Sequence, residues 1–387
     1  MRLFDCASIS VGNPRPMCAY EVTARRWRPR SFGDVVGQDH VVRTLRNAID
    51  AGRVAHAYLF VGPRGTGKTS MARLLAMELV GGGDGNSELR SAIWRGEHMD
   101  VSELDGASNN SIDDVRALRE RCAYGPAVGR RSVFIIDEVH MFSSAAFNGL
   151  LKILEEPPAH VVFIFATTEM AKMPQTVLSR CQRFNFRPMA ADAVVCKLRQ
   201  IAAAENVDAT EDALRAIARL GGGSMRDAQT MFDQMVTYGG GKMDEAAVGE
   251  MYGVAPAKEV GELGDALMNM DAVGAISIVE RWHSSGVDLP MAFRALEDAL
   301  MERLAETFRS GRCCRAMAEL VRTLRSYGRA LPHAASEMAT VAMAMVEAVE
   351  NSRRRPVEWV IDQLLLARLE GQPAALFAED CVVQRKS

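Results

Sequence analysis

Gly62-Pro-Arg-Gly-Thr-Gly-Lys-Thr69 decides the fold of this chain, because it fits the phosphate-binding pattern G-x-x-x-x-G-K-[ST]. The apolar run His56–Val61 precedes it, and Ser70–Val80 after it has apolar residues three and four positions apart. A strand that turns through glycines into a helix aims consecutive backbone N–H groups at one point. The stretch therefore predicts an α/β domain with a site for a polyphosphate.

Each residue type in this loop has a task in holding a triphosphate. Glycines let the chain wrap the phosphates, the Lys68 ammonium reaches the β- and γ-phosphate oxygens, and the Thr69 hydroxyl ligates Mg²⁺. The alternative is a plain glycine turn. The strand before the loop and the helix after it favour the phosphate site, because that site requires both. We expect nucleotide binding by Gly62, Gly65, Thr66, Gly67, Lys68, Thr69 and Ser70.

Two more apolar runs, Val133–Ile136 and Val161–Ala166, are typical of parallel strands that helices cover on both faces. The first is followed by Asp137 and Glu138. In a phosphate-loop protein, an acid leaving such a strand suits a partner of the Mg²⁺, here Asp137. Glu138 beside it is expected to polarise the attacking water. The alternative for both acids is a solvated strand end.

Two polar residues at other points are also expected to meet the nucleotide. Thr168 follows the third apolar run, where its hydroxyl can bind a water or the γ-phosphate, although threonine is common in strands in any case. Arg226 follows Ser224, a good N-cap, so it falls in the first turn of a helix, where the macrodipole disfavours a cation. A nearby anion explains that position; the alternative is a solvated surface arginine.

Composition limits the class of protein. The 387 residues carry 46 positive and 49 negative groups, 48% hydrophobic residues and 25% charged residues, as in soluble globular domains. The net charge of −3 argues against an all-over basic coat for nucleic acid, but allows a local basic lining. The scattered cysteines form no C-x-x-C pair, and no apolar run could span a bilayer. We expect a cytoplasmic protein with no membrane partner.

The helical pattern takes over after Pro188, and glycine clusters mark two joints. Arg353-Arg354-Arg355-Pro356 precedes a last expected helix, Val357–Leu369. The fold class is thus an α/β domain followed by a small helical domain and an all-α C-terminal domain. The expected boundaries are a tail at 1–19 (or a start at Met17), then 20–188, 189–241, 242–371, and a second tail at 372–387.

A set of ordered motifs resembles the AAA+ clamp loaders, most closely the γ/τ family of bacterial DNA polymerase III. Besides the phosphate loop, the set comprises Arg26-Trp-Arg-Pro29, Val36-Gly-Gln38, Asp137-Glu-Val-His140, Asn148-Gly-Leu-Leu-Lys-Ile-Leu-Glu-Glu-Pro-Pro158, Ala166-Thr-Thr168 and Ser179-Arg-Cys181. The motifs lie between about Tyr20 and Arg226. From there to about Gly371 the resemblance rests only on the helical pattern and the length of the segment.

The resemblance implies an AAA+ ATPase domain, a helical lid and a collar that holds a pentamer together. ATP would lie between subunits, with Arg180 as an arginine finger on the neighbour's ATP. Tyr20 and the Val35-Val36 turn would line the adenine pocket, and Lys152 would contact DNA phosphates. The implied partners are the δ, δ′ and further γ subunits, the sliding clamp and primer–template DNA.

The sequence departs from the family pattern in two places. The usual four-cysteine zinc module is absent, since Leu79 to Asp105 contains no cysteine and His98 alone cannot build a tetrahedral site, so we expect no zinc. The short stretch after 371 leaves no room for the domains by which a τ form binds helicase and polymerase α. We therefore expect a γ-type subunit.

The function expected from these residues is ATP-driven opening and loading of the sliding clamp on primed DNA during chromosomal replication, near the nucleoid. Lys68, Asp137, Glu138 and Arg180 are the expected catalytic residues of an ATP hydrolase that has no polymerase site. Two alternatives remain: a non-hydrolysing structural subunit like δ′, and another AAA+ DNA-remodelling ATPase such as a Holliday-junction motor.

Overall fold

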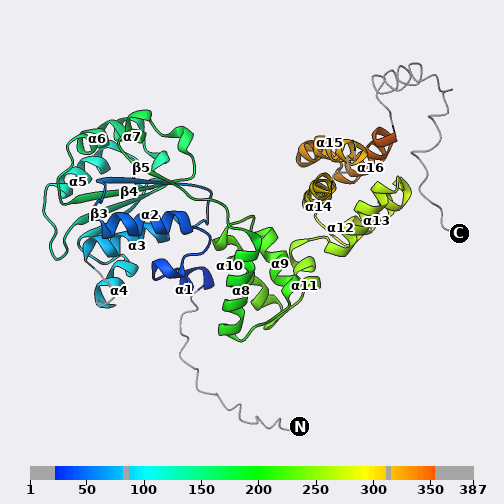
Figure 1. Cartoon of the computed structure of the whole chain (residues 1–387), viewed down its shortest axis with the longest axis horizontal. Helices are drawn as coiled ribbons and strands as arrows, with labels where there is room; N and C mark the ends of the chain where they lie inside the picture. Colours follow the sequence, from blue (N-terminus) through cyan, green and yellow to red (C-terminus); the bar gives the residue numbers. More distant parts are fainter. Residues whose placement is uncertain (1–21, 82–86, 311–314, 354–387) are drawn as a thin grey trace, which may run out of the picture. The chain divides into compact units, whose positions relative to one another are not determined.

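The computed structural model describes residues 22–81, 87–310 and 315–353. The chain divides into two compact units, Met1–Lys242 and Met243–Ser387 (Figure 1). The expected tails, Tyr20 and the expected helix Val357–Leu369 lie outside the described residues.

A five-stranded parallel sheet forms the centre of the first unit. Its strand order is β2-β3-β4-β1-β5. The strands are β1 (Ala57–Val61), β2 (Val101–Asp105), β3 (Ser132–Asp137), β4 (Val161–Thr167) and β5 (Gln182–Asn185). The three apolar runs predicted as strands are β1, β3 and β4, so that prediction is confirmed to within one residue at each end.

The two edge strands, β2 and β5, are absent from the sequence prediction. Their sequences are Val-Ser-Glu-Leu-Asp and Gln-Arg-Phe-Asn, and polar side chains interrupt both. An edge strand is covered by fewer neighbours than a central one, so it lacks the continuous apolar run by which the central strands are recognised. The missing signal is therefore a consequence of their place in the sheet.

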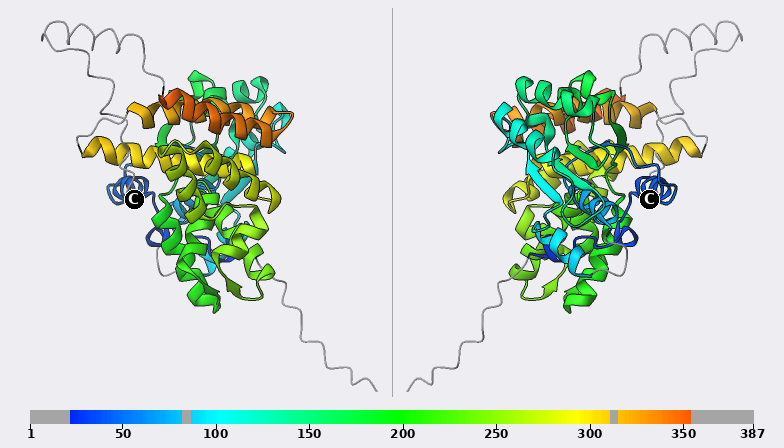
Figure 2. Two further views of the ribbon diagram at one scale, coloured as in Figure 1. Left: turned by 90° about the vertical axis from the view of Figure 1, so that its right-hand side faces the viewer. Right: turned by 90° about the vertical axis from the view of Figure 1, so that its left-hand side faces the viewer.

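Helices cover both faces of this sheet because alternate strand residues point to opposite sides (Figures 1 and 2). Tyr58 and Phe60 of β1 belong to one core, together with side chains from α2, α3 and α4. Leu59 and Ala57 belong to the other, with α5, α6 and α7. The helices are α2 (Asp39–Asp50), α3 (Lys68–Val80), α4 (Ser87–Arg95), α5 (Ile112–Cys122), α6 (Ser144–Glu155) and α7 (Gln175–Leu178).

Three helices after the sheet form the lid, and a short N-terminal helix is attached to them. They are α8 (Ala191–Glu205), α9 (Glu211–Leu220) and α10 (Met225–Tyr238). The N–H of Thr23, in α1 (Thr23–Arg26), donates to the buried Asp233 carboxylate of α10 at 2.6 Å. The indole N–H of Trp27 donates to Glu205 at 2.6 Å. Short elements complete the unit: η1 (Phe32–Asp34), η2 (Val139–Met141), η3 (Met170–Lys172) and β6 (Asp208–Ala209).

The described part of the second unit is helical, as the sequence predicts. Its buried core includes Leu263, Trp282, Leu296, Leu324 and Met345. The two-residue β7 (Lys242–Met243) spans the boundary between the units. The elements after it are α11 (Glu245–Tyr252), α12 (Ala257–Met268), α13 (Ala272–Ser284), α14 (Leu289–Arg309), α15 (Arg315–Ala330), η4 (Leu331–His333) and α16 (Glu337–Arg353). Among the helices within the described ranges, none has the length and apolarity that a bilayer span requires.

Asp100 holds the loop before β3 against the start of β2. Its carboxylate accepts backbone N–H groups of Ala127 (2.6 Å), Val128 (2.9 Å) and Gly129 (2.6 Å), and the residue is 5% exposed. Burial alone raises the pKa of a carboxyl group, but here the three donors outweigh it and lower the pKa of Asp100. The folded protein therefore favours the charged form of Asp100. This contribution to the free energy of unfolding is fully present at pH values above the pKa that Asp100 has in the unfolded chain.

Asp100→Asn is expected to lower the free energy of unfolding by about 2 kcal/mol at pH 7, because one amide cannot accept all three donors. The stabilisation from Asp100 is lost as pH falls through its depressed folded pKa, so the difference between the two proteins should shrink below about pH 4. Urea unfolding, with hydrogen exchange of residues 127–129, measures both effects. The exposed Asp113→Asn is the control, and an equal loss in that variant would contradict this role of Asp100.

Candidate nucleotide-binding site

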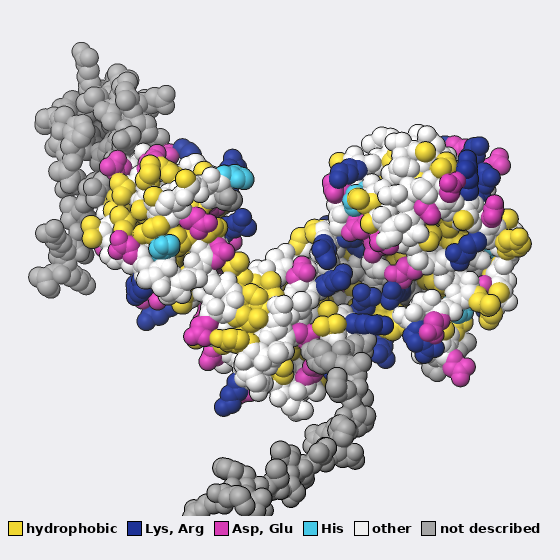
Figure 3. All heavy atoms as spheres, turned by 180° about the vertical axis from the view of Figure 1, so that it is seen from behind, with side chains coloured by type: hydrophobic (Ala, Val, Ile, Leu, Met, Phe, Trp, Pro, Cys, Tyr) yellow, Lys and Arg dark blue, Asp and Glu magenta, His cyan; other side chains and the backbone are white. Residues whose placement is uncertain are grey.

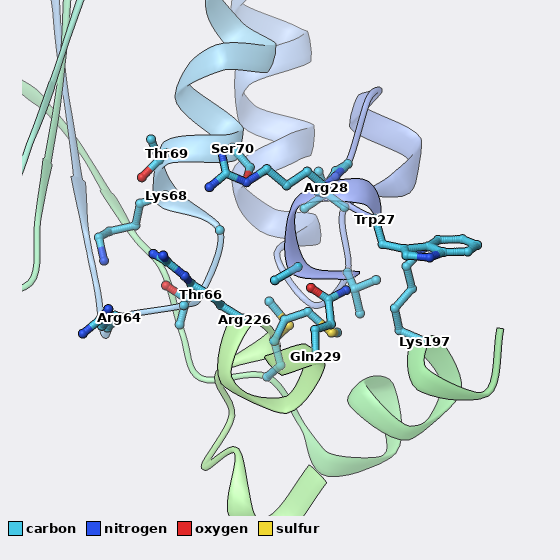
Figure 4. A pocket seen from close by; sticks show the side chains of 18 of the residues that line it. Trp27, Arg28, Arg64, Thr66, Lys68, Thr69, Ser70, Lys197, Arg226 and Gln229 are labelled. Carbon is cyan, nitrogen blue, oxygen red and sulfur yellow. The ribbon is translucent and has the colours of Figure 1, made fainter. Parts of the chain in front are cut away.

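A cavity of about 500 Å³ opens between the phosphate loop, the segment after α1 and the lid (Figure 4). This size is in the range of small-molecule sites. Of the residues expected at the nucleotide or metal, the cavity is lined by Val36, Gly65, Thr66, Gly67, Lys68, Thr69, Ser70, Asp137, Glu138 and Arg226. Gly62, Lys152, Thr168 and Arg180 do not line it, and Tyr20 lies outside the described residues.

The loop has glycine where a side chain could not fit. A Cβ on Gly62 would lie 2.5 Å from the Phe186 carbonyl oxygen, and one on Gly65 would lie 1.8 Å from the Ser224 hydroxyl oxygen. Gly65 and Gly67 also have φ angles of +74° and +94°, which favour glycine. The loop is therefore packed closely between the sheet and the lid, with its backbone against the cavity.

Lys68 begins α3 and is 5% exposed. Its ammonium donates to the carbonyl oxygens of Gly62 at 2.8 Å and Pro63 at 2.9 Å. Burial lowers the pKa of Lys68, while the charges of Glu138 and Asp137 raise it. The cation therefore lies within the loop at a helix N-terminus, a place that favours anions.

Thr69 and Asp137 meet although 68 residues separate them. The Thr69 hydroxyl donates to an Asp137 carboxylate oxygen at 2.6 Å. A hydroxyl and a carboxylate are the oxygen donors that Mg²⁺ prefers, and Mg²⁺ usually takes few protein ligands and completes its shell with phosphates and water. The pair fits a Mg²⁺ that arrives with a nucleotide. Within residues 22–81, 87–310 and 315–353 there is no group of three or more His, Cys, Asp or Glu able to hold a metal, and the absence of zinc stays a prediction.

Glu138 is held by the strand beside its own. One of its carboxylate oxygens accepts the backbone N–H of Thr168 at 3.2 Å and the Thr168 hydroxyl at 3.1 Å. Nδ1 of His140 lies 3.3 Å from the same oxygen. Glu138 also has φ of +46°, uncommon for a residue other than glycine. The Thr168 hydroxyl thus contacts Glu138 in this structure, not the cavity.

Arg226 reaches the cavity from the lid. Ser224 caps α10 by accepting the N–H of Asp227 at 3.2 Å, so Arg226 lies in the first turn as the sequence predicts. Figure 4 shows Arg226 on the same side of the cavity as Lys68 and Arg64. Burial, and then the charges of Arg73 and Arg226, lower the pKa of Arg28. An anion bound beside Arg28 and Arg226 would reduce the repulsion between them. Figure 3 shows Lys and Arg side chains gathered where the lid meets the α/β part.

Arg180 and Lys152 lie away from the cavity of their own chain. A guanidinium nitrogen of Arg180 lies 2.9 Å from a Glu155 carboxylate oxygen, and another donates to the Thr176 carbonyl at 2.8 Å. The Arg180 side chain is one-third exposed. Lys152 is exposed on α6, one turn before Glu155. Neither side chain can act on a ligand in this cavity, but both are open to a neighbouring molecule.

The structure adds cavity residues that the sequence reasoning did not select as site residues. They include Trp27, Arg28, Arg64, Lys197 and Gln229. Arg64 lies inside the phosphate-loop pattern and Arg28 inside the Arg26-Trp-Arg-Pro29 motif, so both had a local signal. Lys197 and Gln229 come from the lid, and no local pattern separates them from other helical residues.

Comparison with known proteins identifies the family. A family model described as "DNA polymerase III, delta subunit" matches residues 37–190, and one described as "DNA polymerase III clamp loader subunit, ATPase lid domain" matches residues 193–241. The DNA polymerase III subunit gamma of Buchnera aphidicola subsp. Acyrthosiphon pisum is 37% identical over 275 residues, which cover 70% of this chain and 76% of that protein. The chain belongs to the DNA polymerase III gamma/tau family. The resemblance seen in the sequence is therefore confirmed.

Two further comparisons give the extent of the likeness. The DNA polymerase III subunit tau of Salmonella typhimurium is 40% identical over 276 residues, or 70% of this chain, and the match spans 43% of that longer protein. Among solved structures, the Thermotoga maritima RuvB Holliday junction branch migration motor has a TM-score of 0.46 and 19% identity, over 62% of this chain and 79% of that chain.

Lys68→Ala is expected to weaken ATP binding by about a hundredfold or more, because it removes the cation from the phosphate end of the cavity. The fold should survive, since Lys68 bonds only to carbonyls of its own loop. Calorimetric titration with Mg-ATP measures the affinity, with the exposed Lys172→Ala as control. Unchanged affinity in Lys68→Ala would refute the assignment of the phosphate site.

Proposed function

We propose that this chain is the ATP-hydrolysing subunit of a clamp loader, which uses ATP to open a sliding clamp and close it around primed DNA. Membership of the gamma/tau family supports the proposal. The observation that carries it is the meeting of Lys68, the Thr69–Asp137 pair and Arg226 around one cavity. The proposed place of action is the cytoplasm, at the nucleoid.

The chain's own residues would bind the triphosphate by complementary charge. Lys68 and the N–H groups at the start of α3 face its phosphates, and Arg226 reaches them from the lid. Thr69 and Asp137 would hold Mg²⁺, which neutralises charge on the phosphate oxygens when bound. Because Arg226 belongs to the lid and Lys68 to the loop, a shared polyanion would draw the two parts together.

Glu138 is the proposed base, with Thr168 as the residue that controls it. In this structure one carboxylate oxygen, Oε2, accepts hydrogen bonds from both the N–H and the hydroxyl of Thr168. While these bonds last, that oxygen is less available to accept a proton from water. To reach the attacking water, Glu138 would use its other carboxylate oxygen or release the contact to Thr168. If that contact is released, Thr168 would be free to contact the water or the γ-phosphate.

Arg180 is the proposed trigger for a neighbouring chain. It lies outside its own cavity and is partly exposed, so its charge is available to a nucleotide held by another subunit. The proposed neighbours are further copies of this chain and the δ and δ′ subunits, in a pentamer held by the helical second unit. Lys152, exposed on the nearby helix α6, is the proposed contact to primer–template DNA.

A structural, non-hydrolysing subunit is the second candidate, because the family model matching residues 37–190 is described as a delta subunit. Such a subunit would not need the buried Lys68 or the Thr69–Asp137 hydrogen bond, both of which are present. Their presence favours hydrolysis.

Glu138→Gln is expected to lower the rate of ATP hydrolysis by about a hundredfold or more, since an amide cannot accept a proton from water. ATP affinity should stay within about threefold, because the phosphate contacts are unchanged. Phosphate release and calorimetric titration measure the two quantities, with the exposed Glu97→Gln as control. A near-normal rate would assign the base to another residue.

Arg180→Ala is expected to leave ATP affinity unchanged and to lower clamp- and DNA-stimulated hydrolysis by about a thousandfold. The experiment reconstitutes the loader with δ-type subunits, sliding clamp and primed DNA, and uses the exposed Arg183→Ala of β5 as matched control. The proposal fails if the isolated wild-type chain hydrolyses ATP at the stimulated rate whatever its concentration.

A further inference from the structure

Gln229 is a buried polar residue on the lid that faces the cavity. It belongs to α10, lines the cavity and is only 4% exposed. Among the residues that the structure describes, none is hydrogen-bonded to its side-chain amide, whereas the comparably buried Asp233 on the same helix bonds to Thr23. The amide oxygen and nitrogen are not among the fully buried polar atoms that lack a partner, so they are open to the cavity and available to hydrogen-bond a ligand there.

The cavity has two chemically different ends. Figure 4 shows Arg226 directed towards Lys68 and Arg64, and the Gln229 amide directed towards the segment that carries Arg28. Lys68, Arg64 and Arg226 therefore mark the phosphate end. Outside the phosphate loop, the cavity is also lined by apolar side chains. They are Trp27, Val35, Val36, Met189 and Met225.

The apolar side chains and the Gln229 amide suit a flat heterocyclic base better than a sugar or a phosphate. Lys197, which also lines the cavity, lies over the Trp27 ring with its Nζ 5.4 Å from the ring centroid. The apolar side chains bury the faces of the base, and the amide satisfies polar atoms on its edge. A glutamine offers one carbonyl acceptor and two N–H donors side by side. The 6-amino group and N7 of adenine are the matching donor and acceptor, a pairing that glutamine makes in bidentate form.

We propose that Gln229 recognises the base of the nucleotide, its carbonyl accepting from the 6-amino group of adenine and its N–H donating to N7. Guanine has acceptors, O6 and N7, at both of these positions. One of the two would therefore lie against the amide carbonyl oxygen with no hydrogen to bond them. Gln229 therefore selects ATP over GTP. This inference rests on the proposed nucleotide site and adds to it the residue that reads the base.

The test compares ATP with purine riboside triphosphate, which has the same sugar, phosphates and N7 but lacks the 6-amino group. Both are titrated calorimetrically, with Mg²⁺, into the full wild-type chain, Gln229→Leu and Gln200→Leu. Leucine fills a similar volume without hydrogen bonds, and Gln200 is an exposed glutamine of lid helix α8. The wild type and Gln200→Leu should bind ATP about five to ten times more tightly than the analogue.

Gln229→Leu should bind both compounds with nearly equal affinity, close to that of the wild type for the analogue. Its preference for ATP over GTP should fall by a similar factor. The inference is overturned if Gln229→Leu keeps the full preference for ATP while binding it well, and the nucleotide site then stands. A wild type that binds ATP and the analogue equally also overturns it, even if the variant fails to fold. A wild type that binds no nucleotide overturns the site and the inference together.

Discussion

Close packing of the phosphate loop against two neighbours is the constraint on which the rest of the site depends. Gly62 lies against the backbone at Phe186 just after β5, and Gly65 lies against Ser224, the residue that caps lid helix α10. Because no side chain fits at either glycine, the loop backbone approaches the sheet and the lid at once. That approach places Lys68 and Arg226 around the same cavity.

The sequence predicts the parts of this arrangement that have a local cause. Continuous apolar runs indicate the central strands, and the glycine pattern indicates the loop. The polar edge strands β2 and β5 give no such run. Lys197 and Gln229 are brought to the cavity only by the packing of the lid, and the partner of Arg180, Glu155, lies 25 residues away in the chain. Contacts that depend on tertiary packing leave no pattern in a single sequence.

Two groups of the proposed reaction are already occupied by partners within the chain. Glu138 accepts two hydrogen bonds from Thr168, and Arg180 pairs with Glu155. Each of these contacts is modest in free energy, since a hydrogen bond or a partly exposed ion pair contributes about 1 kcal/mol. Contacts of this size keep a group in place, and the proposed nucleotide and neighbouring subunit would need to displace only contacts of this size. The proposed assembly would therefore release both groups at small cost.

The attachment of α1 to the lid has a mechanical consequence. Thr23 and Trp27 bond to Asp233 and Glu205, while the chain continues from α1 through Val36 into helix α2 beside the sheet. Because residues 28–38 connect α1 to α2, a rotation of the lid that carried α1 with it would also displace this segment. A change in the position of the lid would reach the cavity wall at Arg28 and Val36 through this covalent connection.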